Sequence, residues 1–346
     1  MNILFRCDGS TEIGLGHVVR CLALADELKT VHGCSVTFAM RKSKLGMEMV
    51  RKNYPVLTPH VDNENFNYEV WLYDLVQFTD SDVLVLDVRD GLDPLILEKI
   101  KAKNILVVDI DDNEKKRLRA DLVFYPPVPQ VEEMNWKGFS GKLFCGWEWV
   151  ILRKEFASRN PSPCNREKLD KNGPHVLVTM GGSDPKAMTF KVIKALNQIR
   201  DSRFLATVVI GAGFAEREKL DQEIRSCRVP ARVLENVSDM AGLMKTADMA
   251  VCAFGVTAYE LAASGVPAIH MCLTRDHEKS SESFVKAGVA EGVGLYNSTT
   301  IQVLSEKIKA MIKSSQKRSQ MKQTGMGLFS ACGVDNIAKT IVSAIR

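Results

Sequence analysis

Short apolar runs alternate with amphipathic segments along the chain, and this rhythm restricts the fold more than any other feature of the sequence. In the first half, the run NILFR is followed by HVVRCLALADEL, SVTFAM, VLVLD and ILVVD. Apolar runs of about four to eight residues that alternate with helical patterns are typical of βαβ units and of a mostly parallel sheet. The sequence therefore predicts an α/β fold.

The rhythm stops once, in the polar and proline-bearing stretch KEFASRNPSPCNREKLDKNGP, and restarts with HVLVTMGG. A chain of 346 residues has room for two domains of ordinary size. We expect two Rossmann-like domains in a GT-B-like architecture, with the ligand in the cleft between them and long helices at about 301–323 and 335–345. The expected parts are an N-terminal domain (1–155), a linker (156–174), a C-terminal nucleotide-binding domain (175–330) and a last helix (331–346), which in this architecture often packs back on the first domain.

Charge and cysteine usage narrow the class of protein further. The net charge of +4, from 46 basic and 42 acidic residues, is too small to favour nucleic acid and mildly suits an anionic ligand. The nine cysteines form no C-x-x-C pair and no metal-site spacing, which fits a reducing cytoplasm. We expect a cytoplasmic monomer without a metal, a signal peptide or a membrane-spanning segment.

The first candidate site follows the first expected strand. Asp8 ends that strand, Gly14 and Gly16 flank a tight turn, and His17 and Arg20 open the next helix. A helix N-terminus disfavours an imidazolium ion, so a histidine there stays neutral and suits general-base catalysis. The alternative is a turn histidine without chemistry. The glycines and the position at the first βα turn favour function.

The glycines of this turn do not form a dinucleotide-binding motif. Gly14-Leu15-Gly16 is followed by His17, Val18 and Val19, so the small third residue of a full G-x-G-x-x-G pattern is absent. We therefore expect no nicotinamide cofactor, and no other cofactor is indicated.

A second glycine turn opens the second half of the chain. Gly181, Gly182 and Ser183 follow a strand, with Asp184 expected as the N-cap and Pro185 as the first helical residue. Free amides at such a helix start accept a phosphate. The alternative is a tight βα turn without a ligand.

A third turn combines amides with a carboxylate. Gly255, Val256 and Thr257 follow another strand, and Glu260 lies one turn into the helix. The amides suit a diphosphate, and the carboxylate suits the hydroxyls of a ribose. Without this context, Glu260 would be an ordinary solvated helix residue.

Polar residues also follow two further strands. Asp276, His277 and Glu278 come after PAIHMCL, and Asp87 ends VLVLD. Side chains at the carboxyl ends of parallel strands face the ligand site of such folds, so these residues are expected to contact the sugar or to orient a base. A solvated loop is the alternative for residues 276–278.

Taken together, the segments FRCDGSTEIGLGHVVRCLALADEL, CGWEWVILRKEF, TMGGSDPKAMTFKVIKAL, ENVSDMAGLMKTADMAV and TAYELAASGVPAI give the chain a family resemblance. It resembles the UDP-2,4-diacetamido-2,4,6-trideoxy-β-L-altropyranose hydrolases of pseudaminic acid biosynthesis and their spore-coat polysaccharide relatives. The likeness covers nearly the whole chain in the same order. More remotely, the second half looks like the N-acetylglucosaminyl transferase that completes lipid II.

The resemblance implies a metal-independent hydrolysis at the anomeric carbon of a UDP-linked diacetamido-trideoxyhexose. His17 matches the histidine that activates water, and Gly14, Gly16 and Arg20 match the motif around it. Glu260 matches the ribose-binding acid, and Val237 falls where backbone contacts hold the uracil. The segment Asp276-His277-Glu278 replaces Asp-Asn-Gln of many relatives, which implies a different sugar.

Two further readings use the same residues. In a glycosyltransferase of this fold, His17 would deprotonate an acceptor hydroxyl in place of water, because only the nucleophile differs between the two reactions. A binding module without catalysis would keep the motifs of the second half but has no use for His17. We expect the hydrolase, with the transferase as the alternative.

Overall fold

The computed structural model describes residues 1–10, 14–41, 43–60, 66–157, 173–329 and 332–345. The chain divides into two compact units. Unit 1 comprises Met1–Arg153 and Ala331–Arg346, and unit 2 comprises Lys154–Ser330. Most of the expected linker, 156–174, lies outside the described residues. Each unit is a parallel α/β sheet covered by helices, which confirms the expected fold class.

Unit 1 is built on a parallel sheet of seven strands in the order β3-β2-β1-β4-β5-β6-β7. Its central strands are buried along their whole length, as expected of strands with helices on both faces. The strands are β1 (Asn2–Cys7), β2 (Ser35–Ala39), β3 (Val56–Leu57), β4 (Val83–Asp87), β5 (Leu106–Ile110), β6 (Leu122–Tyr125) and β7 (Lys142–Cys145). The α-helices are α1 (Gly16–Thr30), α2 (Lys44–Arg51), α3 (Tyr68–Phe78), α4 (Pro94–Lys101), α5 (Gln130–Glu133) and α14 (Gly333–Ile345), with 3-10 helices η1 (Lys115–Arg119) and η2 (Trp147–Trp149).

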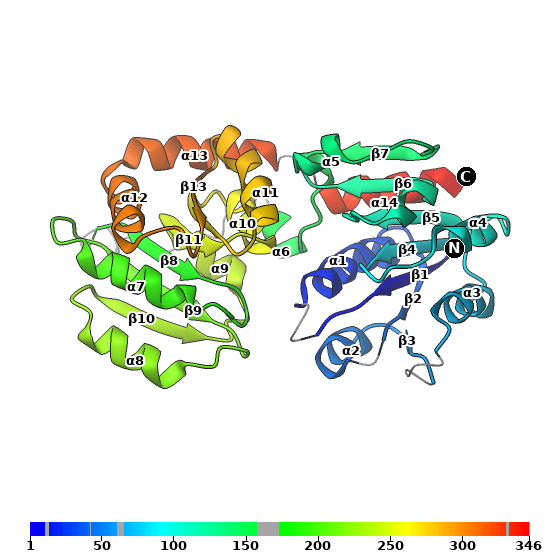
Figure 1. The fold of residues 1–346 in the computed structure, drawn as a ribbon, viewed down its shortest axis with the longest axis horizontal. Coiled ribbons are helices and arrows are strands. Elements are labelled where there is room, and N and C mark those ends of the chain that lie inside the picture. The colour runs from blue at the N-terminus through cyan, green and yellow to red at the C-terminus, as the bar shows by residue number, and fades with distance from the viewer. Residues whose placement is uncertain (11–13, 42, 61–65, 158–172, 330–331, 346) are drawn as a thin grey trace. The chain divides into compact units, whose positions relative to one another are not determined.

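The last helix belongs to unit 1 although it follows unit 2 in the sequence. Figure 1 shows α14, in red, beside the strands of the first unit. Its side chains Val334, Ile337 and Ile341 join the same apolar core as Leu24 and Leu28 of α1. The core therefore holds together segments more than three hundred residues apart in the chain.

The region of α13 (Ser315–Leu328) and α14 is also apolar enough to need an explanation. Among the described residues, the stretch Ser315–Ile345 includes an 18-residue window as apolar as a membrane span, with a mean hydropathy of 1.3. The apolar face of α14 is accounted for by its packing in the core of unit 1. That no segment of this chain spans a membrane stays a prediction.

Unit 2 is built on a parallel sheet of six strands in the order β10-β9-β8-β11-β12-β13. The strands are β8 (His175–Thr179), β9 (Leu205–Ile210), β10 (Ala231–Glu235), β11 (Met249–Ala253), β12 (Ala268–Cys272) and β13 (Ala290–Leu295). The helices are α6 (Lys154–Ala157), α7 (Met188–Gln198), α8 (Arg217–Ser226), α9 (Met240–Lys245), α10 (Val256–Ala263), α11 (Arg275–Lys286), α12 (Ile301–Lys313) and α13 (Ser315–Leu328).

The helix expected at 301–323 is two helices. Ser314 separates α12 from α13, with φ −106° and ψ 86°, and its side chain accepts a hydrogen bond from the amide of Lys317. A serine that caps a new helix start ends the preceding helix, and the apolar periodicity on either side does not reveal it.

Candidate functional site

The first βα turn of unit 1 places His17 at the start of a helix. β1 ends at Cys7 and α1 begins at Gly16, so His17 is the second helical residue. Gly14 has a φ of +82°, a left-handed conformation that favours glycine. The turn therefore fixes where α1 begins and which edge of the sheet His17 faces.

His17 is hydrogen-bonded to a buried carboxylate. Its Nδ1 atom lies 2.6 Å from Oδ1 of Asp87, the last residue of β4, which is fully buried. An ionised carboxylate only accepts hydrogen bonds, so Nδ1 carries the hydrogen and Nε2 keeps its lone pair in the neutral ring. The His17 side chain is 26% exposed. An imidazole held in this way can take a proton through Nε2.

Arg20 binds the same carboxylate from the next turn of α1. Its Nε donates to Oδ2 of Asp87 at 2.8 Å, and its Nη2 donates to Oδ1 at 2.7 Å. Burial would raise the pKa of Asp87, but the charges and hydrogen bonds of Arg20 and His17 outweigh burial and hold this pKa well below its ordinary value. Asp87 therefore stays ionised at neutral pH beside the ring of His17.

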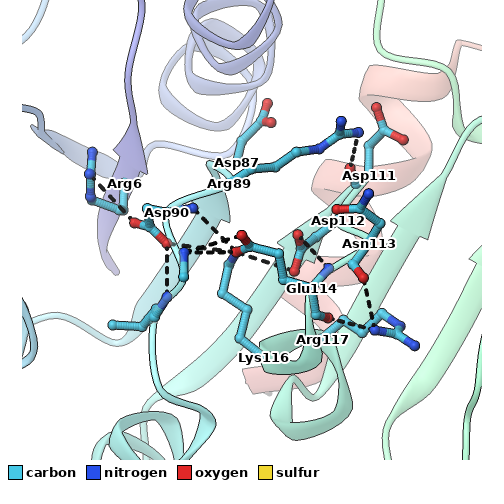
Figure 2. A network of polar contacts seen from close by, with 12 residues as sticks. Arg6, Asp87, Arg89, Asp90, Asp111, Asp112, Asn113, Glu114, Lys116 and Arg117 are labelled. Atoms are coloured by element: carbon cyan, nitrogen blue, oxygen red, sulfur yellow. Dashed lines mark hydrogen bonds and ion pairs between the residues drawn. The ribbon is translucent and has the colours of Figure 1, made fainter. Parts of the chain in front are cut away.

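A second carboxylate, that of Asp111, completes this cluster. The Nη1 group of Arg20 donates to Oδ2 of Asp111 at 2.8 Å, just beyond the end of β5. The guanidinium of Arg89 in turn donates to the carbonyl oxygen of Asp111 at 3.3 Å, and Figure 2 shows this side chain extending from the end of β4 to Asp111. The ends of two neighbouring strands are thus held together around Arg20.

Asp8, which was expected to bind substrate, is held by neighbours within unit 1. Its Oδ2 accepts from Arg6 Nη2 at 2.7 Å, and its Oδ1 accepts from the backbone amide of Arg41 at 2.8 Å. Arg6 is fully buried and also donates to the hydroxyl of Tyr68, which donates to Asp90. These contacts fix the end of β1 against segments from elsewhere in unit 1.

A buried lysine extends this network to β5 (Figure 2). The Nζ of Lys116 lies 3.3 Å from Asp112 and also contacts Glu114, and the lysine is fully buried. Asp109 is fully buried beside it, and neither carboxyl oxygen has a partner among the described residues. Burial, and then the negative charge of Asp112, raise the pKa of Asp109 well above its ordinary value. Asp109 therefore favours its neutral form more strongly than an ordinary carboxyl group does.

The sequence predicted some of these site residues but not others. It placed Asp87 at a strand end, where a carboxylate orients a base or contacts a sugar, but not as the partner of His17, 70 positions earlier. It missed Tyr68 and Lys116 altogether. Charged residues directly after apolar strands were the available signal, whereas Tyr68 lies within a helix and carries none.

In unit 2, the start of α10 is open. Gly255 is the N-cap, no side chain caps the helix, and the first turn has no acidic residue. Amides at an uncapped helix start carry partial positive charge and attract an anion. Glu260 lies one turn further on and is only 6% exposed. The structure thus keeps the amides of Val256 and Thr257 and the Glu260 carboxyl group within a turn of each other.

The start of α7 differs from the expectation. The helix begins at Met188, not at Pro185, and its N-cap is Ala187. The carboxyl oxygens of Asp184 accept from the amides of Met188 and Thr189 at 2.9 and 2.8 Å. Because the buried Asp184 side chain already uses these amides, the start of α7 is not an open phosphate site.

The glycines before Asp184 remain on the surface of the turn. Gly181 has a φ of +84°, and a Cβ on Gly181 or Gly182 would meet no atom within 4 Å. The carbonyl oxygen of Gly182 accepts from the amide of Gly213 at 3.1 Å, which ties this turn to the one after β9. Gly181, Gly182 and Ser183 therefore offer exposed backbone rather than helix-start amides.

Residues 276–278 form the first turn of α11, not a loop. Thr274 is the N-cap, and its hydroxyl accepts from the amide of His277 at 3.2 Å. The ring of His277 lies 6.0 Å from that of Phe254, which follows β11 and precedes Gly255. Val237 follows β10 and is partly exposed. Because the strands are parallel, all these turns of unit 2 lie at the carboxyl edge of its sheet.

The fold defines the class of protein. Two Rossmann-like units, with parallel sheets of seven and six strands, form the GT-B architecture. The glycosyltransferase family 28 C-terminal domain matches residues 175–339. The crystal structure of MurG from Acinetobacter baumannii is similar over 99% of both chains, with a TM-score of 0.73 at 16% sequence identity.

Two relatives are more particular. The spore coat polysaccharide biosynthesis protein SpsG of Bacillus subtilis is 25% identical over 337 residues, which cover 96% of both chains. The UDP-2,4-diacetamido-2,4,6-trideoxy-beta-L-altropyranose hydrolase of Campylobacter jejuni is 26% identical over 199 residues, 57% of this chain and 66% of the relative. The expected resemblance is thus confirmed: the chain has both proteins among its homologues. The matches indicate an enzyme of the glycosyltransferase, GT-B type.

Proposed function

We propose that the protein is a nucleotide-sugar hydrolase that cleaves a UDP-linked diacetamido-trideoxyhexose to the free sugar and UDP. The observation that carries the proposal is the His17–Asp87 pair at the first βα turn, fixed by Arg20. A binding protein needs no such pair, whereas a general base needs a fixed ring and a stabilised positive charge. The Campylobacter jejuni relative, named as a hydrolase of such a UDP-sugar, supports the choice of substrate.

The proposed reaction transfers one proton, forms one bond and breaks one bond. Nε2 of His17 removes a proton from water while the water oxygen bonds to the anomeric carbon. The bond between that carbon and the diphosphate oxygen breaks, and UDP leaves with the electron pair. The Asp87 carboxylate stabilises the imidazolium that forms. We propose that Asp87 orients His17 rather than contacting the sugar, because its side chain is fully buried.

In the same proposal, unit 2 holds the nucleotide. The amides of Gly255, Val256 and Thr257 bind the diphosphate, and Glu260 accepts hydrogen bonds from the ribose. Backbone groups at Val237 hold the uracil, and the turn Gly181–Ser183 adds exposed amides. The uncapped start of α10 supports this arrangement, in contrast to the capped start of α7.

The remaining polar residues are assigned to the sugar. We propose that Asp8 and the first turn of α11, Asp276, His277 and Glu278, line its binding site, with Gly14 and Gly16 allowing close approach. No metal or cofactor is required by this chemistry. The relatives' names support a role in making a nonulosonic acid or a surface polysaccharide. Free thiols at the described cysteines support a location in the reducing cytoplasm. We propose that the protein acts there as a monomer.

A glycosyltransferase is the second candidate. The match of residues 175–339 to a glycosyltransferase domain favours it, since that match covers the proposed nucleotide-binding residues. In this reaction, His17 would remove the proton from an acceptor hydroxyl. The two candidates differ only in the source of the attacking oxygen.

Isotope labelling separates the candidates. The protein is incubated in water enriched in oxygen-18 with a panel of UDP-sugars, with and without lysate acceptors, and UDP release is followed. The hydrolase proposal expects UDP release without acceptor and one labelled oxygen at the anomeric carbon of the free sugar. UDP release that requires an acceptor, with no free labelled sugar, would establish the transferase.

A further inference from the structure

Three arginines lie at the amino edge of the sheet of unit 2, at the opposite end of the strands from the proposed nucleotide site. Arg200 and Arg203 belong to the connection between α7 and β9, and Arg228 belongs to the connection between α8 and β10. Strands β9 and β10 are parallel neighbours, so their amino ends lie side by side (Figure 1). The topology thus gathers three positive charges that are up to 28 positions apart in the sequence.

The three arginines line a pocket with a volume of about 380 Å³. Its apolar wall includes Phe204 and Val229, which are 3% and 9% exposed. None of the residues that line the pocket is acidic. The pocket therefore combines a hydrophobic wall with a wholly positive set of charged side chains.

Nothing among the described residues neutralises these charges. Their guanidinium groups make no hydrogen bond or ion pair within the described part of the chain, while the neighbouring Asp201 is bound by Lys309 and Lys313 at 2.8 and 2.7 Å. The C-terminal ends of α7 and α8 point to this edge, but each contributes only roughly half a negative charge. Three full positive charges outweigh these two partial charges.

A buried polar group adds a second observation. The hydroxyl of Ser202 lines the pocket, is buried, and has no hydrogen-bond partner among the described residues. A buried hydroxyl without a partner costs free energy, and a ligand that accepts its hydrogen bond removes this cost.

Hydrogen bonds hold the walls of the pocket in place. The side-chain oxygen of Asn197 accepts from the amide of Arg228 at 3.0 Å, which joins the end of α7 to the loop before β10. The amide of Ala206 in β9 donates to the carbonyl of Pro230 at 3.0 Å. The two arginine-bearing connections are therefore fixed to each other before any ligand binds.

We propose that this pocket binds a small soluble anion that carries phosphate groups, at a site separate from the nucleotide site. Guanidinium groups bind phosphate oxygens through paired, parallel hydrogen bonds, and several of them suit a diphosphate or a phosphate monoester. A hollow of about 380 Å³ suits a small molecule better than a flat surface. The inference does not depend on the proposed hydrolase activity.

Calorimetry with inorganic pyrophosphate at low salt tests the site. We expect wild type to bind pyrophosphate and the triple variant R200A/R203A/R228A to lose about tenfold in affinity for each arginine removed. Arg225→Ala, an exposed arginine of α8 outside the pocket, is the matched control and should bind as wild type does. The triple lysine variant R200K/R203K/R228K keeps the charge and should bind less tightly than wild type but more tightly than the alanine variant.

The proposal is overturned if wild type does not bind pyrophosphate, or if the folded alanine variant binds it as tightly as wild type does. Sedimentation with vesicles that contain phosphatidic acid separates the two sources of phosphate. Vesicle binding that depends on the three arginines, without pyrophosphate binding, would overturn the small-molecule site. UDP affinity is measured in parallel, and its preservation in the alanine variant distinguishes this pocket from the nucleotide site.

Discussion

The carboxyl edges of the two sheets differ in chemistry although their strand orders correspond. The carboxyl edge of unit 1 carries buried charges, among them Arg6, Asp87 and Lys116, each fully buried. Unit 2 ends its strands in glycine turns and helix starts, such as Gly181 and Gly255, with few buried charges. Paired side chains fix the carboxyl edge of the sheet in unit 1, whereas the same edge in unit 2 exposes backbone amides.

The same sheet topology can thus serve either to hold a reacting side chain or to bind a nucleotide. A reacting group must be held in one orientation, and a network of buried, paired charges provides that rigidity. A bound nucleotide needs amides and a few acceptors rather than a fixed reactive side chain. In the proposed function, unit 1 carries the chemistry and unit 2 binds the nucleotide, and the following experiments test this division.

The largest expected effect is the loss of turnover in His17→Ala. Removing a general base lowers kcat by about 10² to 10⁴, while UDP affinity should stay unchanged because unit 2 holds the nucleotide. His17→Asn should not restore activity, since an amide cannot take the proton. His32→Ala, just beyond the C-terminus of the same helix, is the control and should turn over normally. A folded His17→Ala protein with normal turnover would remove chemistry from unit 1.

The next effect is on stability, in Asp87→Asn. This change leaves the Arg20 guanidinium without its bidentate carboxylate in a buried place, and breaking such a pair costs about 3 to 5 kcal/mol of unfolding free energy. Denaturant titration measures the loss, and turnover should fall with it because His17 loses its orienting group. Asp201→Asn, which breaks exposed ion pairs of unit 2, should change stability little. Equal losses in the two variants would contradict the contrast between the units.

A smaller effect is expected on binding, in Glu260→Ala. Losing the carboxylate leaves ribose hydroxyls unpaired, which costs about 1 to 3 kcal/mol of UDP binding, or roughly 5- to 150-fold in Kd. Calorimetry with UDP gives the value. Glu282→Ala on the exposed side of α11 is the control. Unchanged UDP affinity in Glu260→Ala would show that unit 2 does not bind the nucleotide in this way.

The smallest effect is a pH dependence of opposite sign in the two units. Burial lowers the pKa of His270 in unit 2 to about 3. Below about pH 6.5, the pKa of a histidine in the unfolded chain, only the unfolded state takes up the proton. The free energy of unfolding therefore decreases as pH falls, by at most about 1.4 kcal/mol per pH unit. Asp109 in unit 1 has a raised pKa, so the folded state holds its proton more tightly than the unfolded state does. The stability that Asp109 contributes therefore rises as pH falls through the folded pKa towards the unfolded value of about 4.

Denaturant titrations of two variants at pH 7 and pH 5 isolate these contributions. His270→Gln should lose less stability than wild type on going to pH 5, because the neutral amide does not titrate. Asp109→Asn should lose more than wild type over the same interval, because the stabilising protonation is gone. Shifts of the same sign in both variants would contradict the assigned charge states.

Much of the local structure was predictable from the sequence. The alternation of NILFR, SVTFAM and VLVLD with helical segments predicted parallel sheets, because both faces of such strands are buried and most of their residues are therefore apolar. The turn before His17 and the helix start after Gly255 were predicted from glycines next to a strand. Local signals failed where one side chain rearranged the backbone, as at Asp184 and Ser314, since a cap changes the helix start without changing the apolar period.

The sequence by itself determined the elements, their order and the edge of each sheet where polar residues gather, because periodicity and turn chemistry act over a few residues. The tertiary structure was needed to show that Asp87 pairs with His17 and that Lys116 is buried among carboxylates. It was also needed to show that one pocket is lined by Arg200, Arg203 and Arg228. Such partners are set by which strands become neighbours, and paired residues here are up to 80 positions apart, as in the pairing of Leu4 with Leu84 and of Cys7 with Asp87. Hydrogen bonds and charge interactions depend on distance in space, and no local pattern of residues encodes that distance.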